Sequence, residues 1–295
     1  MKIKRYLYLS WLVSLLLSDK IQLLIKGLKR LNLTSEKIGE KKKKGKGAEN
    51  KDMVFVQGGK YTPSFFNEER EVSNLEVLKY PVTQGMWEEL MGNSASNFVS
   101  GRNPIVKISW WETLKYCNKL SEKYGLEPVY DLRDDELKIN QLGKKSVYPD
   151  RADFRKTEGY RLPTELEWEW FARGGEIAIR NGTFDSQYAG NNNLDEVAWW
   201  IKNSKGKTHV VGTKKPNELG LYDCSGNVSE WCYDTANDNY ISKKKNYRYD
   251  SSKGTRILRG GCCYSDEDDC RVYGRGYTEA TVQYDLFGFR VVRNV

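Results

Sequence analysis

The stretch from residue 181 to residue 255 constrains the fold more than any other feature of the sequence. It consists mostly of Asn, Gly, Lys and Asp, with Trp and Tyr scattered along it. Clusters of Gly, Asn and Asp favour turns and loops over helices and strands. We therefore expect this stretch to form loops on a compact frame that the residues on either side supply.

Two helices are predicted before that stretch. The first covers residues 110–124, where apolar residues recur every three or four positions and Ser109 precedes them as an N-cap. The second begins after Thr164, which pairs with Glu167 in the pattern of a capping box, and it ends at Gly174. Both helices should pack an apolar face against the frame.

Short strands are predicted around these helices. Residues 53–56 are apolar and are followed by two glycines, and residues 80–87 indicate a strand that runs into a helix capped by Thr83. Few helices combined with many short strands indicate the α+β class. We expect one domain at residues 53–295, with no internal repeat.

Residues 1–52 differ from the rest of the chain in charge. The whole chain has a net charge of +8, and 14 basic against 5 acidic residues fall within this tail. The tail therefore has a net charge of +9 and the remaining residues a net charge of −1. A basic face that follows phosphates is not expected on the folded part, so we expect no nucleic-acid partner.

The same tail contains an apolar segment that is typical of a secretion signal. Basic residues precede an uncharged run at 6–18, which is too short to cross roughly 30 Å of hydrocarbon. Residues 21–34 could form a basic amphipathic helix that tethers the protein to a membrane, and Lys41–Lys44 indicate a flexible linker. We expect export to a bacterial cell surface or envelope; the alternative is that translation truly begins at Met53.

His209 is the one histidine among the 295 residues. A Ser-His-Asp triad, a Cys-His dyad or a histidine-rich zinc site would depend on this side chain alone. Most nucleophilic and zinc-dependent hydrolase chemistry is therefore not expected.

Eight segments between residues 53 and 295 resemble, in order, the motifs of the formylglycine-generating enzyme, or sulfatase-modifying factor, domain. They begin at Met53 (MVFVQGG), Tyr80 (YPVTQ), Ile105 (IVKISWW), Arg161 (RLPTELEWE), Asn217 (NELGLYD), Gly226 (GNVSEW), Arg259 (RGG) and Gly288 (GFRVV). The resemblance implies an irregular, loop-rich variant of the C-type lectin fold. This agrees with the α+β class expected from the residues.

The catalytic residues of that enzyme are not matched in this chain. The resemblance implies a copper-binding cysteine pair, spaced C-x4-C, shortly after the Arg-Gly-Gly motif. Here Cys262, Cys263 and Cys270 follow the motif and no two of them have that spacing. We therefore expect no catalysis, with a copper-dependent cysteine oxidase as the alternative.

The resemblance also extends to the variable proteins of diversity-generating retroelements, which share this fold. In those proteins, mutagenesis directed at adenines rewrites Asn codons between an Arg-Gly-Gly motif and a terminal Gly-Phe-Arg. The corresponding window here is 262–287, within a variable region of about 256–293. Changing the first two bases of an Asn codon gives Cys, Tyr, Ser, Asp, Gly, Val, Ala, Leu or Phe, and the window is rich in these residues.

Within this window we expect a set of ligand-binding positions, which we call the display residues. Tyr offers contact area and a hydroxyl at low entropic cost, and Gly offers access. The display residues are Cys262, Cys263, Tyr264, Asp266, Tyr273, Gly274, Gly276, Tyr277, Val282, Tyr284, Asp285 and Leu286.

Other residues near the window are expected to hold the scaffold. We expect buried carboxylates to bind the guanidinium groups of four arginines, namely Arg259, Arg271, Arg275 and Arg290. Asn227 and Glu230 occupy positions that, by resemblance, lie near a structural calcium. No cofactor is required for the expected function.

These observations predict an exported monomer that binds a ligand through a diversified C-terminal surface. A surface rich in aromatic residues suits a protein or host-surface partner better than a small molecule in an enclosed pocket. A structural protein of the cell envelope is a further alternative.

Overall fold

The computed structural model describes residues 50–92, 100–133, 136–143, 145–149, 152–236 and 254–295. These residues belong to one compact unit, Ala48–Val295. The signal-like segment and the linker predicted before residue 50 lie outside the described residues. Within the described part of the chain, no helix is long and apolar enough to cross a membrane.

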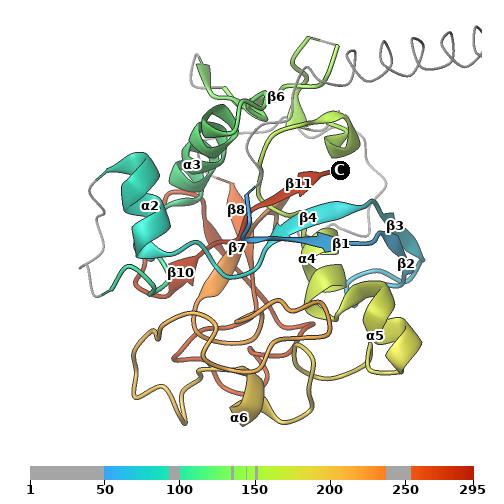
Figure 1. Ribbon diagram of the computed structural model, residues 1–295, viewed down its shortest axis with the longest axis vertical. Helices are drawn as coiled ribbons and strands as arrows, with labels where there is room; N and C mark the ends of the chain where they lie inside the picture. Colours follow the sequence, from blue (N-terminus) through green and yellow to red (C-terminus); the bar gives the residue numbers. More distant parts are fainter. Residues whose placement is uncertain (1–49, 93–99, 134–135, 144, 150–151, 237–253) are drawn as a thin grey trace, which may run out of the picture. The chain divides into compact units, whose positions relative to one another are not determined.

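A three-stranded sheet joins the two ends of the domain. Strand β4 (Leu75–Leu78) lies in its centre, between β1 (Met53–Val56) and β11 (Val292–Asn294), and both neighbours run antiparallel to it (Figure 1). Because β1 and β11 share β4, the first and last strands of the domain lie in one sheet. The predicted strand at residues 53–56 is thus confirmed.

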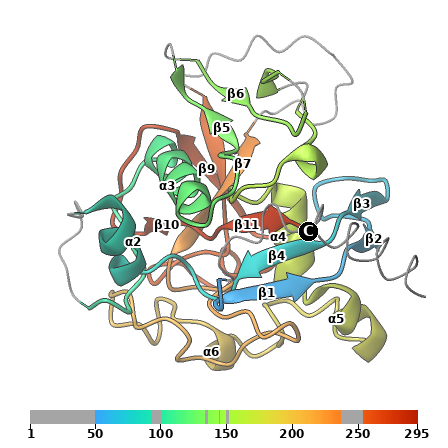
Figure 2. The same ribbon diagram turned by 45° about the horizontal axis from the view of Figure 1, so that its top comes forward.

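A four-stranded sheet carries the predicted variable region. Its order is β10 (Phe287–Gly288), β7 (Ser229–Thr235), β8 (Thr255–Arg259) and β9 (Arg275–Glu279). Strand β10 is parallel to β7, and the other pairs are antiparallel. Figure 2 labels β7 and β9 of this sheet, and β8 pairs with both of them. Two further antiparallel pairs are small: β2 (Gly59–Tyr61) with β3 (Arg70–Val72), and β5 (Tyr130–Asp131) with β6 (Lys138–Ile139).

Three helices begin where the capping residues predict. Helix α2 (Gln84–Met91) is capped by Thr83, α3 (Trp110–Lys123) by Ser109, and α4 (Glu165–Ala172) by Thr164. Capping boxes close the first turns of α3 and α4, so backbone N–H groups without helical partners are satisfied. Figure 1 shows α2 and α3 next to each other, and α4 next to α5.

Short helical elements were not predicted. They are α5 (Gly175–Asn181), α6 (Leu194–Val197) and a 3-10 turn at Phe154–Lys156. The first begins directly after Gly174, whose positive φ of 88° ends α4. Gly174, which the sequence marks as the end of one helix, therefore also begins the next helix, α5.

Four fully buried tryptophans connect distant parts of the core through their indole N–H groups. Trp168 donates to Glu230 Oε2 at 2.9 Å, Trp110 to the carbonyl of Cys232 at 2.9 Å, and Trp231 to that of Ile108 at 3.2 Å. The fourth, Trp170, donates to the Gln57 carbonyl at 3.0 Å. Each indole thus buries its ring and still satisfies its N–H, which leaves no desolvation penalty.

The loops expected at residues 181–255 are present in part, since α6 and the strand β7 form within this stretch and residues 237–253 lie outside the described residues. Residues 198–228 form no helix or strand, and Figure 1 shows them below the sheets together with the loop after β8. The class is mixed α+β with the irregular C-type-lectin-like architecture, as the sequence motifs imply.

Candidate ligand-binding surface

Residues outside the variable window hold its first loop through main-chain atoms. Cys263 N donates to the carbonyl of Asn227 at 3.0 Å, and the Ser204 hydroxyl donates to the carbonyl of Cys263 at 2.6 Å. Ile201 N donates to the carbonyl of Ser265 at 3.2 Å. These bonds use no side chain from the window. Within the loop, the side chains of Ser265 and Asp266 accept further backbone N–H groups, from Cys262 and from Asp268 and Asp269.

Arg259 holds the next turn in the same way. Its guanidinium donates to the carbonyls of Val272 at 2.9 Å, Tyr273 at 3.3 Å and Gly274 at 3.1 Å. It also pairs with Glu169 at 2.6 Å, and both side chains are fully buried. A buried, charge-assisted network of this kind fixes the backbone of the turn.

The end of the window is held by three further backbone bonds. Trp110 N donates to the carbonyl of Ala280 at 3.0 Å, and Lys107 N donates to that of Tyr284 at 3.1 Å. Ser229 N donates to the carbonyl of Leu286 at 2.9 Å. The N-terminus of α3, the segment before it and the start of β7 therefore all support the window.

Two more of the predicted scaffold arginines pair with buried carboxylates. Arg290 lies 2.7 Å from Glu230, and both side chains are buried. Arg275 contacts both oxygens of the buried Glu165, at 2.6 and 2.9 Å. The geometry of Arg259, Arg275 and Arg290 agrees with the role expected of them.

Arg271 differs from that expectation. It pairs with Asp268 at 3.0 Å, and the Asp268 side chain is 81% exposed. It also bonds to the hydroxyls of Tyr273, a display residue, and of Tyr188. Arg271 is therefore half-buried, and among the described residues its carboxylate partner is the exposed Asp268.

Most display residues have the exposure that the window predicts. The four tyrosines have exposed fractions of 56% for Tyr264, 40% for Tyr273, 66% for Tyr277 and 54% for Tyr284. Three other display residues are exposed, Asp266, Gly276 and Asp285, and two are half-buried, Val282 and Leu286. The four tyrosines are the large hydrophobic display residues with exposed side chains.

Three display residues are placed differently from the prediction. Cys262 and Cys263 are buried, because the bonds that hold the loop turn both thiols inward. Gly274 leaves no room for a side chain, since an added Cβ would lie 2.6 Å from the carbonyl oxygen of Asp269. Cys262 and Cys263 are thus buried, although Cys263 also lines a cleft against this surface, and Gly274 is half-buried.

A cleft of about 290 Å³ lies against this surface. Its lining combines four display residues with residues outside the window. The display residues are Cys263, Tyr264, Asp285 and Leu286, and the others are Gln84, Val106, Lys107, Gly206, Lys207 and Thr208. Lys107 Nζ lies 3.0 Å from Asp285 Oδ1. Display residues therefore form part of the lining of this cleft.

Gly206 allows Tyr264 to lie along one wall of that cleft. An added Cβ on Gly206 would be 2.8 Å from the Tyr264 hydroxyl, and its φ is 64°. Both the close approach and the left-handed backbone favour glycine here.

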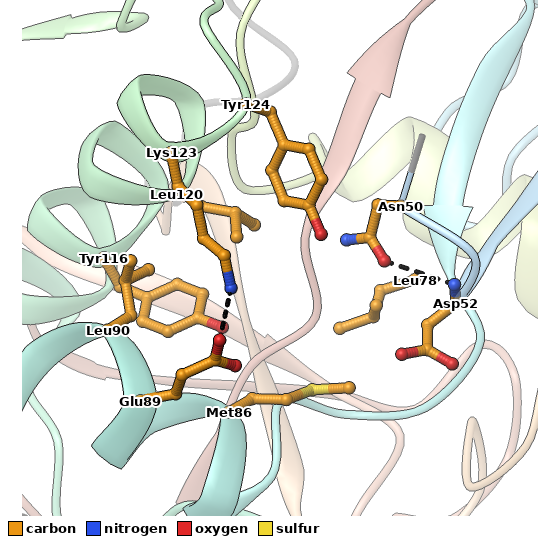
Figure 3. A pocket seen from close by; sticks show the side chains of 10 residues that line it. All are labelled: Asn50, Asp52, Leu78, Met86, Glu89, Leu90, Tyr116, Leu120, Lys123 and Tyr124. Atoms are coloured by element: carbon orange, nitrogen blue, oxygen red, sulfur yellow. Dashed lines mark hydrogen bonds and ion pairs between the residues drawn. The ribbon is translucent and has the colours of Figure 1, made fainter. Parts of the chain in front are cut away.

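A second, smaller cavity lies between α2, α3 and the start of β1, as Figure 3 shows. Its volume is about 70 Å³, and Lys123 forms an ion pair with Glu89 beside it at 2.7 Å. No display residue lines it. We therefore place the candidate site at the larger cleft.

Asn227 and Glu230 do not fit a calcium ion. Asn227 Oδ1 accepts the N–H of His209 at 2.9 Å, and the Glu230 carboxylate accepts from Arg290 and Trp168. Oxygens that already accept protein hydrogen bonds beside a guanidinium are poor ligands for a hard cation. Within the described residues, no group of three or more His, Cys, Asp or Glu side chains is arranged to hold a metal ion.

The thiols after the Arg-Gly-Gly motif are poorly placed for redox chemistry. Burial raises the pKa of Cys263 to about 12 and also raises the pKa of Cys270 well above its usual range. A thiolate, the reactive form, is therefore disfavoured at both. His209 has a structural role, since its ring stacks on Trp199 with centroids 3.8 Å apart and its Nε2 lies 2.9 Å from the Ser204 carbonyl oxygen.

The comparison with protein families covers most of the chain. Residues 37–295 match the sulfatase-modifying factor enzyme 1-like domain. The chain belongs to this family. The eight motifs between residues 53 and 295 had indicated the same family, and that prediction is confirmed.

Several members of the family are similar over nearly the whole domain. Chaperone protein LppX of Paenibacillus barcinonensis is 33% identical over 264 residues, which cover 82% of this chain and 89% of the relative. Treponema denticola variable protein 1 is 30% identical with a TM-score of 0.64, over 82% of this chain and 95% of that chain. The structure of CarF is 27% identical with a TM-score of 0.63, over 83% and 98% of the two chains. The likeness to the treponemal variable protein TvpA that the motifs indicate is thus confirmed.

Formylglycine-generating enzymes match a smaller part of the chain. The formylglycine-generating enzyme of Streptomyces coelicolor is 30% identical over 133 residues, or 42% of each protein. The family thus includes both enzymes and proteins with other names, so membership alone does not assign a reaction.

Proposed function

We propose that this protein is a binding protein of the variable type, which selects a protein or host-surface ligand with its display residues and catalyses no reaction. We further propose that it is exported and acts as a monomer at a bacterial surface. Export is supported by the apolar run at residues 6–18, preceded by basic residues.

One observation carries the proposal. Residues outside the window hydrogen-bond to its main-chain atoms, while the tyrosines of the window face solvent. Ile201, Ser204, Asn227 and Arg259 all bond to backbone atoms of the window. A backbone held in this way tolerates exchange of the exposed side chains, which is what diversification requires. Exposed Tyr residues supply rigid contact area at low entropic cost.

The likeness to Treponema denticola variable protein 1 supports the same proposal. The spacing of the cysteines after Gly261 supports a role without catalysis, since no pair matches the C-x4-C spacing that the family resemblance implies for the copper site.

Sequencing the gene and its surroundings tests the proposal. We expect a near-identical DNA repeat that differs mainly at adenines, beside a reverse transcriptase gene. Differences between copies should fall on codons for exposed residues such as Tyr264, Tyr277 and Tyr284. No repeat, or differences that fall mainly on buried scaffold codons, would exclude a variable protein.

A further inference from the structure

The cleft beside Tyr264 has an unbalanced positive charge. Three charged side chains line it: Lys107, Lys207 and Asp285. Lys107 and Asp285 neutralise each other, with 3.0 Å between Nζ and Oδ1. Lys207 is exposed, and no carboxylate of the described residues forms an ion pair with it. The cleft therefore carries one free ammonium group at its rim.

We infer that this cleft binds the carboxylate of an aspartate or glutamate side chain on a protein partner, with Lys207 as the cation that meets it. The inference rests on the proposed binding function and names the chemistry of one contact. A volume of about 290 Å³ is small for a whole ligand and suits one inserted side chain.

The charge of the cleft favours a carboxylate over a phosphate. No arginine lines it, so the bidentate recognition typical of phosphate sites is not available. One free ammonium balances a single negative charge. The ring of Tyr264 and the side chains of Val106 and Leu286 would cover the methylene groups of an inserted side chain.

The residue at position 285, which belongs to the variable window, changes the net positive charge of the cleft. It is a display residue, and Lys107, which lies outside the window, is held beside it by the bond from its N–H to the Tyr284 carbonyl. A neutral residue at position 285 would free the Lys107 ammonium and double the positive charge available. The residue at 285 is thus a specificity determinant for acidic partners.

A titration of the full-length protein with small probes tests this assignment. The acidic probe is N-acetyl-glutamate N-methylamide, and the matched neutral probe is the glutamine analogue, followed by amide shifts of Thr208, Tyr264 and Leu286 in NMR at low salt. Exposed ion pairs contribute little, so we expect the acidic probe to bind about two- to five-fold more tightly. Lys207→Gln should remove that preference, and Asp285→Asn should increase it by a similar factor.

Lys205→Gln is the matched control, because Lys205 is an exposed lysine in the same loop that does not line the cleft. Equal binding of the two probes, an equal loss in Lys205→Gln, or tighter binding of inorganic phosphate would overturn the assignment. Unchanged thermal melts of each variant show that the fold is intact. Failure here leaves the proposed function standing, because that function is tested independently by the DNA repeat.

Discussion

The role of each residue in the variable region depends on whether the main chain directs its side chain towards solvent or towards the core. Side chains directed outward can contact a ligand, and side chains directed inward support the scaffold. The sequence predicts the exposed tyrosines correctly, because Tyr next to Gly in a polar loop has little apolar surface to pack against. It could not predict that Cys262 and Cys263 turn inward, since this depends on Ser204 and Asn227, which lie far away in the sequence. Long-range hydrogen bonds decide the orientation here.

Phe289 should be among the most sensitive positions. It is fully buried, with its ring edge-on to Tyr116 at 5.2 Å and to Trp87 at 6.3 Å. We expect Phe289→Ala to lower the free energy of unfolding by about 3 to 5 kcal/mol, through lost burial and the cavity left behind. Denaturant unfolding measures this change. A loss below about 1 kcal/mol, equal to that of an exposed site, would contradict it.

Asp223 should make stability depend on pH. Burial raises its pKa from 3.8 to about 6, although the N–H of Gly212 donates to it. A raised pKa means that the folded state binds the proton more tightly, so the stabilising contribution is full below pH 3.8 and is lost as pH rises through about 6. The wild type should gain stability relative to Asp223→Asn as pH falls from about 8 to about 5.

Melting curves of both proteins across that range measure the difference. Asp131→Asn is the control, because Arg133 lowers the pKa of Asp131 to about 2, so neither of its states titrates above pH 5. The prediction is contradicted if the difference in stability between wild type and Asp223→Asn does not change with pH, or if the wild type loses stability relative to the variant as pH falls. Asp223 would then not be buried as a charged carboxylate.

At the scale of elements, local signals predict helix starts well and predict edge strands poorly. The caps of α3 and α4 are readable because an N-cap and its partner lie three residues apart. Strand β9 has no alternating apolar pattern in its sequence, Arg275-Gly-Tyr-Thr-Glu, and it forms because it pairs with β8. Its pairing and the cleft beside Tyr264 both depend on contacts between distant segments, which one sequence does not display.

The turn between β8 and β9 should depend on Arg259. Replacing it with Ala removes one of the two arginines that pair with the buried Glu169, which keeps Arg173 as a partner. It also leaves three carbonyls without their donor, and a buried acceptor without a partner costs about 1 to 3 kcal/mol. Hydrogen exchange should show faster exchange for residues 272–279 than in the wild type. The exposed pair Lys202 with Glu267 offers a control, since Lys202→Ala should change neither stability nor exchange there. Unchanged protection of 272–279 in Arg259→Ala would mean that β8 holds this turn without the arginine.

For the whole molecule, motifs spread along residues 53–295 predict family membership and fold. The same motifs do not predict the ligand. The motifs specify turns, caps and buried pairs, which every member of the fold needs. The ligand depends on the exposed residues, which the fold leaves free to change.

The unit Ala48–Val295 should fold without the residues before it. Its core clusters are made of residues after Met53, and β1 and β11 close the domain through β4. We expect a shortened protein beginning at Ala48 to be a soluble monomer that unfolds in one cooperative transition. Aggregation, or a broad transition seen by circular dichroism, would place the domain boundary earlier in the chain.

The thermal melt of one quadruple variant tests the central claim most directly, namely that the scaffold holds the window independently of its display side chains. The variant changes Tyr264, Tyr273, Tyr277 and Tyr284 to Ser. All four rings are exposed, so we predict a melting temperature close to that of the wild type, corresponding to less than about 1 kcal/mol. A variant that is unfolded, or that loses as much stability as Phe289→Ala, would show that these tyrosines belong to the core and that the window is not a display surface.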